Sequence, residues 1–248
     1  MLPYFITVSN IESTDPAQII AGNERVIRPR LADAAFFYDT DRQTPLASRL
    51  DALKQVVFQT KLGSVYEKSD RVSKLAGKIA KLIGSDTGLA ERAGLLTKAD
   101  LLTSMVNEFP DLQGTIGADY ARNDGEEADV AQAIYEQYLP RFSGDVLPST
   151  LTGCAVSIAD KLDTICGLFA IGQPPTGDKD PFAIRRAALG ILRIIVEKKL
   201  DLDLLDCIEL ALTAQQVEIN DGVNNSIFEF ILQRFRAWFQ DENIPASV

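Results

Sequence analysis

The chain has 248 residues, of which 46% are hydrophobic and 24% charged, a balance typical of a folded globular protein and unlike that of intrinsic disorder. Its 35 acidic residues outnumber its 25 lysines and arginines and give a net charge of −10. This charge excludes broad, non-specific adhesion to polyanions, so any nucleic-acid contact must come from a local basic patch.

Histidine is absent from the sequence. Its absence excludes Ser-His-Asp and Cys-His catalysis and histidine-ligated zinc, and leaves carboxylates and lysines for acid–base or metal chemistry. Because no apolar run reaches the roughly 18 residues of a membrane span and no leader pattern is present, we expect a cytoplasmic protein without a membrane contact. The cysteines lack C-x-x-C spacing and are predicted to be small buried hydrophobic residues: Cys154, Cys166 and Cys207.

Residues 1–46 are predicted to be the tail of a preceding domain, a small α/β segment with a strand and short helices. Residues 4–11 (YFITVSNI) alternate and are rich in β-formers, which predicts the strand. Asp15 and Pro16 suit the N-cap and the first position of a helix. This helical region is expected to break near Pro29, because proline lacks the backbone N–H that a helix needs.

From residue 47 onward the pattern is helical. Apolar residues recur at helical spacing over residues 47–60 and 65–83, and Gly84 is predicted to end the second helix. The linkers are short, so we expect a mainly α protein in which residues 47–248 form a single helical domain. Further helices are predicted at residues 88–107, 126–138, 150–171, 181–198, 202–212 and 225–240.

The helix predicted at residues 181–198 has a marked start. Asp180 has the residue type of an N-cap, and Pro181 suits the first helical position. The free backbone N–H groups of such a start can bind an anion.

The basic residues of this helix have two open interpretations. In the first, they pair internally with carboxylates such as Glu197 or Asp163 and hold helices together. Alternatively they contact a phosphate backbone, because guanidinium groups match phosphate oxygens in pairs. The residues expected at such a contact are Lys179, Arg185, Arg186 and Arg193.

Two acidic features have similar alternatives. Asp160 and Asp163 are three residues apart on a predicted helix and share a face, where they could ligate a metal. The alternative is a structural ion pair with Lys161 or with the arginines. Asp124, in an Asn-Asp-Gly turn, is predicted to cap the helix that follows.

One long segment, GDKDPFAIRRAALGILRIIVEK, closely resembles the signature GxKDPFALRRAAxGxxRI of bacterial glycine–tRNA ligase β subunits. The resemblance covers most of the chain and implies a middle portion of that subunit; Met1 directly before a mid-subunit block favours an excised piece of a longer protein. Further blocks resemble the family in the same order: IESTDPAQIIAGNERVIRPRLADAAFFYDTD, VVFQTKLGSVYEKSDRV, AGLLTKADLLTSMVNEFPDLQGTIG, YARNDGEEADVAQAIYEQYLPR and IADKLDTICGLFAIG.

The resemblance implies a heterotetrameric enzyme in which the α subunit carries the glycyl-adenylate site and the β subunit grips tRNA. The whole enzyme would use ATP and Mg²⁺, while this chain would hold no cofactor and would contact the α subunit, tRNA and the rest of the β subunit. The helical domain would be an HD-like bundle, similar to HD-type phosphohydrolases. The RNA-binding residues implied are Lys179, Arg185, Arg186, Arg193 and Arg122.

The sequence departs from these patterns at two places. HD enzymes bind metal through a His-Asp pair and further histidines, whereas the matching place here reads Leu-Leu-Thr97-Lys98, so that only Asp160 remains. Asn123 stands where the family commonly has histidine, which puts any contact of an imidazolium charge in doubt. Three functions stay open: a tRNA-binding part of the ligase, a structural connector without RNA contact, and a metal-dependent phosphohydrolase using Asp100, Asp160 and Asp163, which we do not expect.

Overall fold

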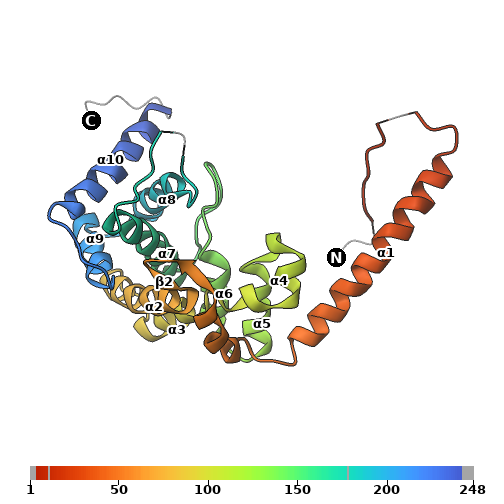
Figure 1. Cartoon of the computed structure of the whole chain (residues 1–248), viewed down its shortest axis with the longest axis horizontal. Coiled ribbons are helices and arrows are strands. Elements are labelled where there is room, and N and C mark those ends of the chain that lie inside the picture. Colours follow the sequence, from red (N-terminus) through yellow and green to blue (C-terminus); the bar gives the residue numbers. More distant parts are fainter. Residues whose placement is uncertain (1–3, 11, 178, 242–248) are drawn as a thin grey trace. The chain divides into compact units, whose positions relative to one another are not determined.

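The computed structural model describes residues 4–10, 12–177 and 179–241 (Figure 1). It is mainly helical, with a small two-stranded hairpin. The chain divides into two compact units, residues 1–43 and residues 44–248. Within the described ranges, no helix is both long and apolar enough to cross a membrane.

The first unit consists mainly of the helix α1, Pro16–Asp41. The predicted start is confirmed, because the Asp15 carboxylate accepts hydrogen bonds from the backbone of the first turn and Pro16 occupies the first position. The predicted break is wrong: α1 continues through Pro29, since the loss of one hydrogen bond is tolerated in a helix of 26 residues.

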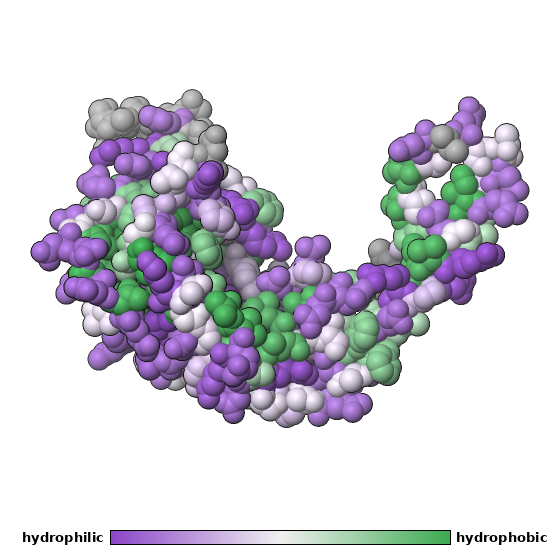
Figure 2. All heavy atoms as spheres, in the orientation of Figure 1, coloured by the Kyte–Doolittle hydropathy of each residue, from purple (hydrophilic) through white to green (hydrophobic). Residues whose placement is uncertain are grey.

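The predicted strand in the first unit is also wrong. Residues 4–10 form no strand, and residue 11 lies outside the described residues. A strand needs a neighbouring edge for its backbone hydrogen bonds, and no described segment supplies one here. Figure 2 shows hydrophobic surface on this unit. The large apolar side chains exposed along α1 are Ile20, Val26, Leu31 and Phe36.

The second unit begins with a 3-10 helix and a hairpin where one α-helix was predicted over residues 47–60. The 3-10 helix η1 spans Leu46–Gln55, followed by strands β1, Val57–Gln59, and β2, Gly63–Ser64. The β-branched pair at residues 56 and 57 favours extended backbone, and Gly63 turns the chain at a φ of 89°. Apolar spacing alone did not separate these alternatives.

The helix α2, Val65–Leu82, agrees with its prediction. Ser64 and Glu67 form a reciprocal capping box at its start. Gly84, at a φ of 72°, follows its end as predicted. The next helix, α3, Thr87–Leu96, packs closely on α2 at Gly94, where a Cβ atom would lie 2.7 Å from the Cα atom of Ser73.

The single helix predicted at residues 88–107 is wrong. After α3 the chain forms the 3-10 turn η2, Ala99–Leu102, and the short helix α4, Ser104–Glu108. The Thr97 hydroxyl donates to the Gly94 carbonyl, and the Thr103 hydroxyl donates to the Asp100 carbonyl and accepts from the Val106 N–H. These threonine side chains compete with helical backbone bonding and divide the segment.

The 3-10 turn η3, Pro110–Leu112, leads to α5, Thr115–Asn123, a helix that the sequence pattern did not predict. It is followed by α6, Ala128–Glu136, close to its expected range. The prediction that Asp124 caps α6 is wrong, because its carboxylate accepts a 2.6 Å hydrogen bond from the backbone N–H of Leu46.

The core of the second unit lies around α7, Leu151–Ala170, which packs against α2, α6, α8 and α9 (Figure 1). The remaining helices are α8, Ile184–Glu197, α9, Leu204–Thr213, and α10, Val223–Asp241. All three cysteines are free and buried, as predicted, and burial raises the pKa of each thiol.

Candidate nucleic-acid interface and buried ionic cluster

The start of α8 differs from its predicted form. The helix begins at Ile184 rather than at Pro181, because Ala183 takes a left-handed backbone conformation with a φ of 54°. The Asp180 carboxylate nevertheless accepts hydrogen bonds from the N–H groups of Ile184, at 2.9 Å, and Arg185, at 3.0 Å. A carboxylate of the chain thus already binds the helix start, so the positive side chains around it are the groups available to an external anion.

Three predicted RNA-binding residues lie at or next to this start. Arg185 is half-buried and donates from Nη2 to the Gly177 carbonyl over 2.7 Å. Arg186 and Lys179 are exposed, and among the described residues neither side chain has a hydrogen-bond or ion-pair partner. Within the described part of the chain, their charges are therefore available to a ligand.

Arg193 has a different environment further along α8. Its side chain is only 11% exposed, and Nε lies 2.6 Å from the Oε1 atom of Glu197. Its Nη1 atom also donates to the carbonyl of Asp145 over 3.0 Å. Arg193 thus has the internal partner, Glu197, that the structural interpretation of the arginines named.

Arg122 lies on α5, away from the sequence segment that carries the other four. It is exposed and donates from Nη2 to the side-chain oxygen of Gln132 on α6, over 3.3 Å. The neighbouring Asn123 amide donates to the Oδ1 atom of Asp124 over 3.4 Å.

We call residues 179–199 the basic segment, because they include six lysines or arginines and two acidic residues in a chain whose net charge is −10. Besides the predicted residues it contains Lys198 and Lys199, both exposed at the end of α8. A local excess of positive charge of this kind is the electrostatic feature that attracts a polyanion.

The candidate metal ligands Asp160 and Asp163 lie instead in a buried group of ion pairs, the ionic cluster. It consists of Lys68, Arg71, Lys98, Asp160 and Asp163.

The ionic cluster joins α2, α7 and the turn between α3 and η2. Lys68 Nζ lies 3.2 Å from Asp160 Oδ1 and 3.1 Å from Asp163 Oδ2, while Lys98 Nζ lies 3.2 Å from Asp160 Oδ1. Arg71 donates from Nε to Asp163 Oδ1 over 2.7 Å. Burial would raise the pKa of Asp160, but Lys68, Lys98 and Lys161 outweigh it and hold that pKa far below its usual range.

The lysines and the arginine of the ionic cluster occupy the carboxylates that were considered as metal ligands. Both carboxylates form ion pairs with lysine or arginine groups, and the described residues contain no group of three or more His, Cys, Asp or Glu side chains arranged for a metal ion. Asp100, the third acid considered, is buried separately; its Oδ2 accepts from the Gly114 N–H over 2.7 Å, and burial raises its pKa.

Lys161 is buried beside the ionic cluster. Its ammonium donates to the carbonyls of Gln137 and Leu139, at 3.1 and 2.8 Å, and to the hydroxyl of Ser157, at 2.7 Å. Burial lowers the pKa of Lys161 to about 7, while Asp160 opposes the shift. The lysine ties α7 to the loop that follows α6.

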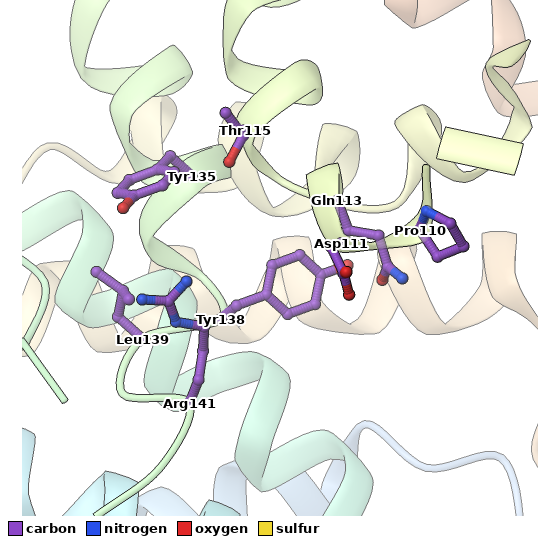
Figure 3. A pocket seen from close by; sticks show the side chains of 8 residues that line it. All are labelled: Pro110, Asp111, Gln113, Thr115, Tyr135, Tyr138, Leu139 and Arg141. Atoms are coloured by element: carbon purple, nitrogen blue, oxygen red, sulfur yellow. The ribbon is translucent and has the colours of Figure 1, made fainter. Parts of the chain in front are cut away.

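A cavity of 190 Å³ opens near Lys98, whose ammonium lies 4.5 Å from the centre of the Tyr138 ring. Its one guanidinium, that of Arg141, is held by Asp145 at 2.9 Å. No lining side chain therefore offers an unpaired positive charge. Figure 3 shows the lining residues, which come from the segment around η3 and α5 and from α6 with the loop after it: Pro110, Asp111, Gln113, Thr115, Tyr135, Tyr138, Leu139 and Arg141.

Sequence reasoning did not find the cationic half of the ionic cluster. A signal was present: Lys68 lies four and seven residues before Val72 and Leu75, on the apolar stripe of α2. A charged residue at a core position implies a buried partner. The identity of the partner, Asp163, 95 residues away, is not encoded in local spacing.

All 248 residues match the family described as glycyl-tRNA synthetase beta subunit. The chain is 60% identical over 248 residues to the glycine–tRNA ligase beta subunit of Hahella chejuensis and 58% identical over 248 residues to that of Marinobacter nauticus. It is 58% identical over 243 residues to that of Klebsiella pneumoniae. These alignments cover 98–100% of the chain and 35–36% of the relatives, so the chain spans about a third of their length.

Proposed function

The chain belongs to the glycyl-tRNA synthetase beta-subunit family, and from this premise we propose that its basic segment binds the phosphate backbone of tRNA within a glycine–tRNA ligase. The observation that carries the proposal is that Lys179 and Arg186 are exposed and, within the described residues, unpaired. Guanidinium and ammonium groups held in this way bind phosphate and release counterions from the nucleic acid.

The reaction of the whole enzyme is part of the proposal. We propose that the ligase uses ATP to attach glycine to tRNA in the cytoplasm, and that this chain supports the reaction by contacts with an α subunit, tRNA and the rest of the β subunit. The described residues offer no group arranged for a metal ion, and the ionic cluster already uses Asp160 and Asp163. We therefore assign ATP and Mg²⁺ to other parts of the enzyme.

We also propose that the second unit is an HD-like bundle that lacks the metal chemistry of HD-type phosphohydrolases. Thr97 and Lys98 stand where the resemblance places the His-Asp pair, and the Lys98 ammonium pairs with Asp160. A positive side chain at a carboxylate competes with a metal cation for it. This argues against phosphohydrolase activity of the chain.

The proposal is tested by titrating the chain with tRNA at several salt concentrations. Replacing Lys179 and Arg186 by alanine is expected to weaken binding and to lower the salt-dependence slope by roughly one to two, because each phosphate contact contributes about 0.9. Neither change removes an internal hydrogen bond of the described residues, so the fold should persist.

A matched control is the double variant Lys78→Ala, Lys81→Ala, which removes two exposed charges from α2. It should leave the slope close to that of the parent chain. Equal slopes for the parent chain and both double variants would refute the RNA contact. They would favour the second candidate, a structural connector, which the pairing of Arg193 with Glu197 and with the Asp145 carbonyl supports.

A further inference from the structure

A groove runs beside the basic segment, between the loop after α6, the helix α8 and the helix α10. One end is a hollow of 150 Å³ and the other a hollow of 460 Å³, and both are lined by Ser143 and Arg193, so the two adjoin. The first hollow also has Phe142 and Arg186 in its lining, and the second has Trp238. The groove thus combines aromatic surface with the guanidinium of Arg186, for which the described residues provide no partner.

The aromatic side chains of the groove are accessible. Phe142 is 57% exposed on its loop. Trp238 is half-buried and lies against Phe239, with ring centroids 5.9 Å apart. Phe239 in turn packs on Phe235, with ring centroids 4.2 Å apart, and the Phe235 ring lies 6.0 Å from that of Trp238. These rings offer faces on which a flat group can stack.

The charges of the described lining residues favour an anionic occupant. Among these residues the one carboxylate, Glu197, is paired with Arg193. Arg186, which lines one end, is exposed, and the described residues provide no partner for it; Lys198 and Lys199, which line neither hollow, follow Glu197 in the sequence. An occupant with both flat aromatic groups and repeated negative charge fits this surface, and unpaired nucleotides have both.

We propose that this groove binds unpaired nucleotides of an RNA strand, with a base stacked on Phe142 or Trp238 and a phosphate on Arg186. This inference rests on the proposed function and adds to it that the groove binds unpaired rather than base-paired nucleotides. A duplex exposes its phosphates but keeps its base faces stacked, so it would use only the charges. The unpaired strand would use the rings as well.

Trp238 is the single tryptophan of the chain and reports on the groove directly. The chain is titrated with a short single-stranded oligoribonucleotide, with a duplex RNA of the same length, and with heparin, a polyanion without bases. Saturable quenching of tryptophan emission is expected with the single strand, and little change with the duplex or with heparin. Equal quenching by heparin would overturn the stacking contact.

The variant Phe142→Ala separates stacking from charge. It should weaken binding of the single strand about 5- to 100-fold, the effect of losing one base–aromatic stack, while leaving the salt slope unchanged. The matched control is Val146→Ala in the same loop, where the side chain is 64% exposed and lines neither hollow. Equal affinities for Phe142→Ala and the parent chain would overturn the inference.

The two proposals fail differently. If tRNA binding depends on Lys179 and Arg186 but neither Trp238 emission nor Phe142→Ala responds to the single strand, the groove inference is wrong and the phosphate contact stands. If tRNA does not bind at any salt concentration, the proposed function is wrong, and the groove inference falls with it.

Discussion

The ionic cluster and the basic segment use the same cationic residue types in opposite surroundings. Lys68, Arg71 and Lys98 are buried, and each is paired with a carboxylate of α7. Lys179 and Arg186 are exposed, with no partner in the described part of the chain. The first group has its charges paired internally, whereas the second has no partner among the described residues.

The difference shows that burial and pairing, rather than residue type, decide what a cation does. A buried charge without a partner is strongly destabilising, so the loss of one member of the cluster should lower the free energy of unfolding. An exposed cation remains hydrated and contributes little to stability, so its removal is tolerated and its charge is free for binding. The predictions that follow test this division.

The largest expected effect is that of Arg71→Met. It leaves the buried Asp163 without its closest cationic partner and should lower the free energy of unfolding by about 3–5 kcal/mol in urea denaturation. The matched control is Lys74→Met on the same helix, whose ion pair with Asp70 is exposed, and it should change stability by no more than about 1 kcal/mol. Similar losses in both variants would remove the distinction between buried and exposed cations.

A second test uses the pH dependence of stability. Burial lowers the pKa of Lys161 from 10.5 to about 7. Between these values the unfolded chain binds a proton at this lysine and the folded chain does not, so this residue makes the free energy of unfolding rise as the pH increases. Lys161→Met should therefore show a flatter rise than the parent chain when both are unfolded in urea at about pH 7 and about pH 9.

Parallel pH profiles for the parent chain and Lys161→Met would contradict this account. They would mean that the three oxygen acceptors of Lys161 retain its proton in the folded chain.

The smallest expected effect separates two arginines of α8. Arg193→Ala removes the bonds to Glu197 and to the Asp145 carbonyl and should lower the free energy of unfolding by about 1–2 kcal/mol. Arg186→Ala should change it by less than about 0.5 kcal/mol, because the side chain is exposed and has no described partner. Thermal unfolding of both variants shows which one loses more stability, and a larger loss of stability for Arg186→Ala than for Arg193→Ala would contradict this prediction.

The long helices of the second unit were predictable because their apolar residues repeat at helical spacing, as in α2 and α7. The break of the helix predicted at residues 88–107 could not be predicted in this way, because it depends on hydrogen bonds from the Thr97 and Thr103 side chains to the backbone rather than on apolar spacing. At residues 4–10 a β-rich pattern forms no strand, since no described neighbour pairs with it.

The candidate site was predictable only in part. The residue types around Asp180 marked a helix start and its basic residues, although the helix begins later than expected. The remaining contacts could not be predicted, because they join residues far apart in the sequence. Arg193 donates to the carbonyl of Asp145, 48 residues away, and Asp163 pairs with Arg71, 92 residues away. Such contacts arise only when the chain has folded.

The most direct test of the division between the two groups of cations is the salt dependence of tRNA binding. It is measured for the parent chain, for Lys179→Ala with Arg186→Ala, and for Arg71→Met under conditions where that variant is folded. We predict a lower slope for the double variant, by roughly one to two, and an unchanged slope for Arg71→Met. An unchanged slope in the double variant, or an equal fall in Arg71→Met, would contradict the account.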